Sequence, residues 1–368
     1  MSNENFDLDN YPNLIAIPYA KTLNEKDPQR KDHQRICLEM ILAYNASVCF
    51  ANYYYYKTVD EGDDLKSKKD LKIGTDLKKL NFDLGMMSIG KWNQVTRDTA
   101  SVLFDATSKG KDNDFLVADI GSMYRNKGSV WNKNVNTLIS SRNQDAHGQI
   151  ISDEALEGEL KNRQKMLDHL MKEMSFYAAY KLIVPINDEV KESVLVHICK
   201  DLSGSGDAVI ELSDETLKTE IDRYGTYLYN TKKKTCLALN PMVVNYNSSP
   251  ETEDLDTYVY SKTANNKKDL HYSNFQGALD LKESNQSSVG SLATPHELCR
   301  EFSKFRMTVE DENLINRKEP KITIHRKFKS GSSIIDEEVF LDVTIQNNGD
   351  ADAQDVETVL DFPRKGFQ

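Results

Sequence analysis

The spacing of apolar residues changes at residue 181, and this change limits the fold more than any other feature of the sequence. Before it, apolar residues recur every three or four positions in 34–56, 89–106, 134–147 and 153–180, as in amphipathic helices. After it, short runs rich in Val, Ile, Leu and Tyr alternate with turn residues, which is typical of strands. An α+β protein is therefore predicted, with its helices first and its strands second.

The helical part, residues 1–180, is predicted to form an antiparallel four-helix bundle. Its first helix carries Ile41, Tyr44 and Val48 at helical spacing, with Asp32 as the expected N-cap. The last helix repeats its apolar residues at a spacing close to that of a coiled coil. The lysine-rich stretch 57–85 is expected to be a loop or a short exposed helix.

The strand-like runs predict a mainly β module over residues 181–282. They are KLIVPI, SVLVHICKDL, TCLALNPMVVNY and DTYVYSK, and the NNKK sequence after the last one predicts a hairpin loop. Residues 283–320 are polar apart from PHELCREFSKF, which predicts a linker with one helix.

The C-terminal segment 321–368 alternates apolar and polar residues on both sides of NNGDADAQD. Two strands around a turn are typical of an immunoglobulin-like sandwich, which usually needs about 100 residues. The segment is therefore expected to be part of such a domain, and the natural chain is expected to be longer.

Composition narrows the class of protein. The 47 Lys and Arg against 58 Asp and Glu give a formal charge of −11, which argues against a general nucleic-acid binder. Phosphate-binding GxxxxGK[ST] and GxGxxG motifs are absent from the sequence, so we expect no nucleotide cofactor. The five cysteines form no CxxC pair, and the seven histidines form no HExxH motif, so no metal site is expected.

The same features predict a cytoplasmic protein without a membrane anchor. An odd number of cysteines without paired spacing is typical of reduced thiols. The N-terminus MSNENFDLDNYPN is polar and acidic, unlike a signal peptide. No apolar run is expected to approach the roughly 18 residues that span a bilayer.

The stretch SSRNQDAHG (141–149) holds the candidate site. With about 100° per residue, Arg142 falls in the same stripe as Val135 and Leu138, while Asn143 and His147 lie at its edge. A guanidinium on a core-facing stripe is costly unless it is paired or faces a polar cleft. Arg142 is thus either a structural arginine that pairs with a carboxylate in the bundle or part of an active site.

Arg142, Asn143 and His147 suffice in principle to cleave RNA without a metal. An arginine fork can hold a phosphodiester and stabilise negative charge in the transition state. A histidine can move a proton to or from a 2′-hydroxyl or a leaving 5′-oxygen, and an asparagine can hold either partner. The preceding segment supplies candidate RNA-binding cations and aromatic rings, although the rings could equally pack in a loop; these residues are Arg125, Lys127, Lys133, Tyr124 and Trp131.

LISSRNQDAHG (138–148) resembles the RNxxxH signature of HEPN domains, which lies on the third helix of a four-helix bundle. Residues 14–54 and SIGKWNQVTRDTASVL (88–103) resemble one bacterial branch of that family. LALNPMVVNY (237–246) and LHYSNFQG (270–277) are similar to a module that often follows such domains. The resemblance covers about residues 1–285 and is closer in the helical part than in the β part.

The resemblance implies a metal-independent endoribonuclease that acts as a homodimer in antiphage defence or as a toxin. Two bundles would place two Arg142–His147 pairs in one RNA cleft, with Arg142 on the scissile phosphate, His147 as the acid or base, and Asn143 as the polar residue beside them. Some toxin members carry a tyrosine two residues after the histidine, where a partner enzyme modifies it. Here that residue is Gln149, so this regulation is not expected.

Two other readings stay open. The bundle could be a non-catalytic dimerisation scaffold in a defence or signalling assembly, or an RNA-binding module that does not cleave. In each case the C-terminal modules could sense a protein or small-molecule trigger. His197 and His271 lie in strand-like runs and are expected to be ordinary packed or exposed strand residues.

Overall fold

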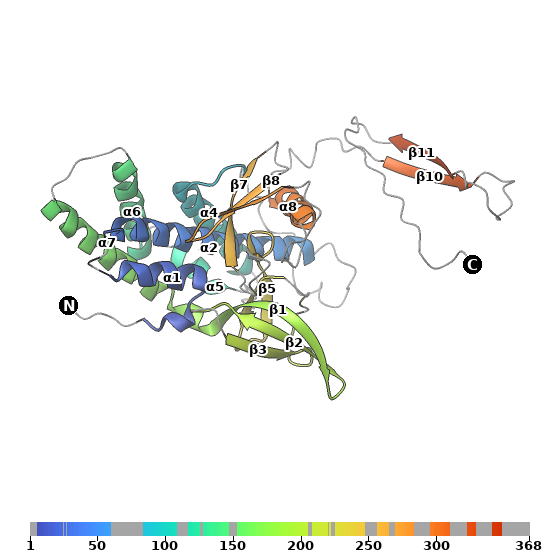
Figure 1. Ribbon diagram of the computed structural model, residues 1–368, viewed down its shortest axis with the longest axis horizontal. Coiled ribbons are helices and arrows are strands. Elements are labelled where there is room, and N and C mark those ends of the chain that lie inside the picture. The colour runs from blue at the N-terminus through green and yellow to red at the C-terminus, as the bar shows by residue number, and fades with distance from the viewer. Residues whose placement is uncertain are drawn as a thin grey trace. The chain divides into compact units, whose positions relative to one another are not determined.

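The computed structural model combines helices with antiparallel sheets and is therefore an α+β protein, as predicted (Figure 1). Its chain divides into two compact units, residues 1–310 and 311–368. The structure describes residues 6–24, 26, 28–59, 84–108, 117–125, 128–146, 153–204, 208–219, 221, 225–246, 256–264, 269–282, 295–309, 322–328 and 341–347.

Helices make up most of the first 180 residues. They are α1 (Asn13–Thr22), α2 (Arg30–Val59), α4 (Ile89–Ser108), α5 (Ala118–Arg125), α6 (Val130–Ala146) and α7 (Asp153–Glu173), after short η1 (Leu8–Asn10) and before η2 (Ser175–Ala179). The predicted helices 34–56, 89–106 and 134–147 are confirmed within a few residues. The predicted helix 153–180 is wrong at its end, because α7 stops at Glu173 and η2 leads into a strand.

Helix α2 is the central element of the first unit and packs against α1, α4 and α7. Its side chains Ile41, Tyr44, Val48 and Phe50 are completely buried. Because α2 begins at Arg30, Asp32 lies in its first turn, and the predicted N-cap role of Asp32 is wrong. The expectation that no stretch could span a bilayer is also wrong: residues 30–55 are long and apolar enough, although 89% of their most apolar window is buried in the structure.

Two antiparallel sheets follow the helices. The five-stranded sheet has the order β3-β2-β1-β4-β5, and the four-stranded sheet has the order β6-β7-β8-β9. The strands are β1 (Tyr180–Lys191), β2 (Val194–Asp201), β3 (Ala208–Ser213), β4 (Tyr227–Asn230), β5 (Thr235–Ala238), β6 (Val243–Tyr246), β7 (Asp256–Ala264), β8 (Asp269–Ser273) and β9 (Ala278–Leu281). The predicted strand runs are thereby confirmed, and β7 and β8 pair as neighbours on either side of NNKK, which lies outside the described residues.

The helices and both sheets share one hydrophobic core. Leu182 of β1, Tyr260 of β7 and Phe50 of α2 belong to the same cluster of buried side chains. Helix α8 (Pro295–Val309), in the segment predicted as a linker with one helix, also joins this core. Its Phe302 stacks on Tyr260 with ring centroids 4.5 Å apart, and its Phe305 meets Phe50 edge-on at 5.9 Å. The predicted domains 1–180 and 181–282 are therefore packed as parts of one unit.

A glycine at the end of β2 anchors the N-terminal segment. The Gly204 amide donates to the Tyr11 carbonyl at 2.8 Å, and Gly204 has a φ of +58°. A Cβ at this position would lie 2.9 Å from the Asp9 Cα, too close for real atoms. Both the backbone conformation and the close approach therefore require glycine.

We expect Gly204→Ala to lower the free energy of unfolding by about 2 kcal/mol, because it combines a strained φ with a backbone clash. Urea denaturation measures this change. The matched control is Gly158→Ala in the middle of α7, where a Cβ has open space and alanine should stabilise the helix by up to about 1 kcal/mol. Equal effects of the two substitutions would contradict this explanation.

The second unit contains an antiparallel hairpin of β10 (Ile322–Phe328) and β11 (Leu341–Asn347). The predicted strand after the NNGDADAQD turn lies outside the described residues. All five cysteines belong to the first unit; each is buried and none forms a disulfide.

Candidate functional site

Helix α6 carries the candidate site at its C-terminal end. The helix starts after Ser129, whose hydroxyl accepts a hydrogen bond from the Asn132 amide at 3.2 Å and so caps the first turn. Trp131, Val135 and Leu138 then form its buried face. Because side chains four residues apart share a face, Arg142 occupies the next position of this stripe, one turn beyond Leu138.

Arg142 is half-buried and Asn143 is exposed in the last turn of α6. The Arg142 Nη1 donates to the Asn143 Oδ1 at 3.4 Å, so the structure brings these two predicted residues into contact. The helix ends at Ala146. His147 is the next residue in the sequence and lies outside the described residues. That it lies close to Arg142 is a prediction from their five-residue spacing.

Two other arginines are buried and paired with carboxylates of α7: Arg30 of α2 lies 3.8 Å from Glu157, and Arg163 of α7 bonds Glu159. Arg163 is only 5% exposed, and its Nε donates to the Glu159 Oε1 at 3.1 Å. The Ser141 hydroxyl of α6 donates to the same oxygen at 2.8 Å. This contact fixes the last turn of α6 against α7. Arg142 makes no ion pair with the residues that the structure describes.

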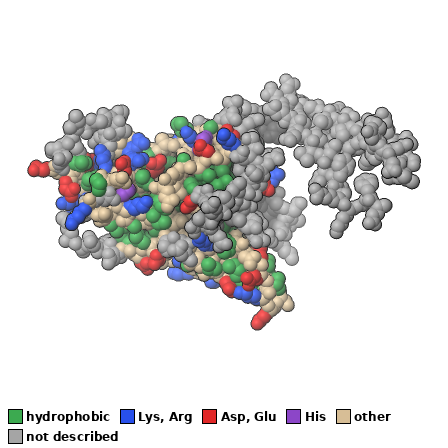
Figure 2. All heavy atoms as spheres, in the orientation of Figure 1, with side chains coloured by type: hydrophobic (Ala, Val, Ile, Leu, Met, Phe, Trp, Pro, Cys, Tyr) green, Lys and Arg blue, Asp and Glu red, His purple; other side chains and the backbone are tan. Residues whose placement is uncertain are grey.

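Lys133, the predicted RNA-binding residue with a described side chain, does not share a face with Arg142. It is exposed on α6, nine residues before Arg142. Nine residues correspond to a rotation of about 180° and a rise of roughly 13 Å, so the two side chains lie on opposite sides of the helix. The Arg125 side chain and Lys127 lie outside the described residues. On the face drawn in Figure 2, basic and acidic side chains are interspersed.

The suggestion that Tyr124 and Trp131 stack on bases is wrong. Each side chain is only 1% exposed, and their rings meet edge-on with centroids 5.4 Å apart. Burial also raises the pKa of the Tyr124 hydroxyl. These rings join α5 to α6 in the core, which is the packing role that the sequence left open.

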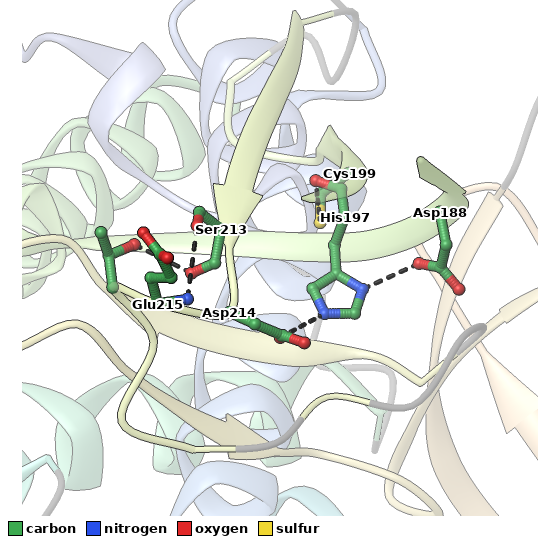
Figure 3. A network of polar contacts seen from close by, with 7 residues as sticks. Asp188, His197, Cys199, Ser213, Asp214 and Glu215 are labelled. Carbon is green, nitrogen blue, oxygen red and sulfur yellow. Dashed lines mark hydrogen bonds and ion pairs between the residues drawn. The ribbon is translucent and has the colours of Figure 1, made fainter. Parts of the chain in front are cut away.

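An unusual polar cluster surrounds His197, and no sequence pattern indicated it. His197 is buried in a strand, which is one of the two expected environments, but its ring lies between two carboxylates (Figure 3). Its Nδ1 is 2.8 Å from Asp188 Oδ1, and its Nε2 is 2.8 Å from Asp214 Oδ1. These aspartates lie 9 positions before and 17 positions after His197 and form no known motif, so only the strand register places them together.

No family model, curated protein or solved structure matches the chain. Among the described residues, no group of three His, Cys, Asp or Glu side chains could hold a metal ion. The resemblance to HEPN domains accordingly rests on the sequence motifs alone, and a function has to be inferred from the residues of the site.

Proposed function

We propose that this protein is a cytoplasmic, metal-independent endoribonuclease of the HEPN type that acts in antiphage defence or as a toxin. The observation that supports this most is the end of α6, where a half-buried Arg142 is hydrogen-bonded to Asn143 and no carboxylate of the described residues neutralises it. His147 follows one residue after the helix. A cation held at a helix end, with a titratable group next to it, suits a phosphodiester substrate.

The chemistry needs the substrate, these side chains and water, which exchanges the proton that His147 does not transfer. The 2′-oxygen of the RNA attacks phosphorus and loses its proton to a base, while the bond from phosphorus to the 5′-oxygen breaks and that oxygen takes up a proton. His147 transfers one of these protons, and Arg142 stabilises the charge that builds up on the phosphate. Asn143 orients the guanidinium. The products are a 2′,3′-cyclic phosphate and a 5′-hydroxyl.

The proposed architecture is a HEPN four-helix bundle of α2, α4, α6 and α7. Two copies pair through this bundle, so that each contributes one Arg142–His147 pair to a single RNA cleft. Arg125, Lys127 and Lys133 contact flanking phosphates, with Lys133 reaching RNA outside the cleft because of its place on α6. The second unit is part of an immunoglobulin-like sandwich that, with the β module, receives a protein or small-molecule trigger.

The end groups of the products test this proposal. Purified protein incubated with RNA in EDTA should release fragments with 2′,3′-cyclic phosphate and 5′-hydroxyl ends. An oligonucleotide with a 2′-deoxy sugar at the cut position should stay intact, because it lacks the nucleophile. Cleavage of the deoxy substrate, or a requirement for a divalent cation, would contradict the proposed mechanism.

A non-catalytic scaffold is the alternative function. Ser141 of α6 and Arg163 of α7 both donate hydrogen bonds to Glu159, which holds the end of α6 against α7. A fixed pair of helices also suits a dimer interface. This alternative predicts no RNA loss under any condition and a dimer that survives Arg142→Ala. An RNA-binding module without cleavage would instead bind RNA with strong salt dependence and leave it intact.

A further inference from the structure

The bonding around His197 requires a charged imidazole. Both ring nitrogens lie 2.8 Å from carboxylate oxygens, and an ionised carboxylate can only accept hydrogen bonds. A neutral imidazole carries one N–H and can satisfy one of the two contacts. The arrangement in Figure 3 is therefore complete only when both ring nitrogens carry protons and each donates to one aspartate.

The two aspartates come from different parts of the sheet. Asp188 lies directly opposite His197 on the neighbouring strand β1. Asp214 is the first residue after the edge strand β3, and it begins the segment 214–219, which we name the strap. The His197 side chain thus connects the centre of the sheet to the start of the strap.

The strap runs from one edge of the five-stranded sheet to the other. At its start, the Asp214 amide donates to the Leu195 carbonyl of β2 at 3.1 Å. At its end, the Lys218 amide donates to the Lys234 carbonyl beside β5 at 2.9 Å, and the Thr219 hydroxyl accepts from the Cys236 amide at 2.7 Å. Since β3 and β5 are the two edges of the sheet, the strap links these edges.

Beneath the strap lies a small core that is separate from the main one. Leu217 of the strap packs against a cluster of seven buried residues, most of which lie on one face of the five-stranded sheet. They are Ile183, Cys199, Leu212, Ile221, Tyr227, Tyr229 and Cys236. Two of the five cysteines therefore depend on this core for protection, while Cys37, Cys49 and Cys299 are buried elsewhere.

The charged groups that face His197 are Asp188 from β1 and Asp214 from the strap. Cys199 lies two residues along β2, but burial raises the pKa of its thiol to about 12, so it is neutral. On the opposite face of the hairpin, Lys191 pairs with Glu189 and Glu211. Burial lowers the pKa of His197, but the hydrogen bonds and charges of the two aspartates outweigh this and raise it above the ordinary value.

We propose that the Asp188–His197–Asp214 cluster is a proton-operated latch that holds the strap closed over Cys199 and Cys236. When the imidazole loses one proton, it can donate to only one aspartate. Asp188 is fixed by strand pairing, whereas Asp214 is nearly half-exposed and lies at the start of a turn, so the Asp214 contact is the one released. The strap then opens more often and the thiols beneath it become accessible.

The direction of the pH effect follows from the raised pKa. The folded state binds the His197 proton more tightly than the unfolded chain does. The latch therefore stabilises the closed strap fully below about pH 6.5, the ordinary pKa of histidine. Its contribution falls as the pH rises through the raised pKa of His197. The strap is therefore closed in mildly acidic solution and loosens in alkaline solution.

Thiol protection measures the latch directly. The full-length protein is labelled with iodoacetamide at pH 6 and at pH 9. The labelling rate of each cysteine is divided by its labelling rate in the urea-unfolded chain at the same pH. This ratio removes the effect of pH on the ionisation of the thiol itself. Protection of Cys199 and Cys236 should fall about tenfold from pH 6 to pH 9, the size expected for one charge-assisted hydrogen bond. Cys37, Cys49 and Cys299 are internal references and should stay protected.

Three variants separate the latch from general unfolding. Asp214→Asn and His197→Gln should expose the two thiols already at pH 6 and abolish most of the pH dependence. Glu215→Gln removes a neighbouring charge of the strap that does not bond the ring, and it should behave like the wild type. If His197→Gln does not fold, Asp214→Asn still decides the matter. Equal protection at the two pH values, or the same fall in Asp214→Asn, would overturn the proposal.

Discussion

Replacing Arg142 with alanine is expected to slow RNA cleavage by about 10²–10³-fold, the usual effect of losing one group that stabilises transition-state charge. Arg142 is half-buried at the end of α6, so its loss removes the positive charge that is proposed to contact the phosphate. The helix itself should remain, because the last turn is tied to α7 through Ser141 and Glu159. Initial rates on an end-labelled RNA measure the change, and circular dichroism verifies the fold.

Two further substitutions sharpen this test. Arg142→Lys keeps the charge but loses the planar fork that fits two phosphate oxygens, so it should retain part of the activity. Arg97→Ala removes a half-buried arginine of α4 and should leave the rate unchanged. If Arg97→Ala and Arg142→Ala reduce cleavage equally, the effect comes from net charge and the proposed role of Arg142 is wrong.

Phe302→Ala should destabilise the first unit by about 3–5 kcal/mol, the range for truncating a buried phenylalanine. Phe302 is 1% exposed and stacks on Tyr260, so its removal leaves a cavity where α8 meets β7. The free energy of unfolding from urea denaturation, followed by fluorescence and circular dichroism, gives the size of the loss.

Met307→Ala on the same helix is the matched control. Met307 is 45% exposed, and its truncation should change the free energy of unfolding by less than about 0.5 kcal/mol. A similarly small effect of Phe302→Ala would mean that α8 is attached loosely and that the segment around it behaves as a linker. A single unfolding transition is expected for the helices and both sheets, since they share one core.

The sequence predicts the long elements because their signal is local. Helix α4 has a clear apolar period over several turns, α2 contains a long stretch rich in apolar residues, and β1, β2 and β7 are rich in β-branched and aromatic residues. Helix α1 was missed because it is only ten residues long and contains Pro18, which normally signals a helix boundary. Helix α5, with eight residues, gives too short a pattern to recognise.

Features that depend on tertiary contacts could not be predicted. The helical wheel placed Arg142 correctly on the core-facing stripe of α6, but nothing in the spacing indicated that Ser141 and Arg163 would share Glu159 beside it. The sequence left base stacking and packing equally open for Tyr124 and Trp131, and only their contact across α5 and α6 decides for packing. The His197 cluster depends on the pairing of β1 with β2 and on the turn after β3.

The most direct test of the proposed function is RNA cleavage by the wild type and by His147→Ala at equal concentration. We expect cleavage by the wild type and a loss of at least about 100-fold in the variant, because general acid–base catalysis usually contributes that much. His169→Ala, at an exposed position of α7, should keep full activity. Equal cleavage by the wild type and His147→Ala would show that His147 is not the acid or base and that the proposed function is wrong.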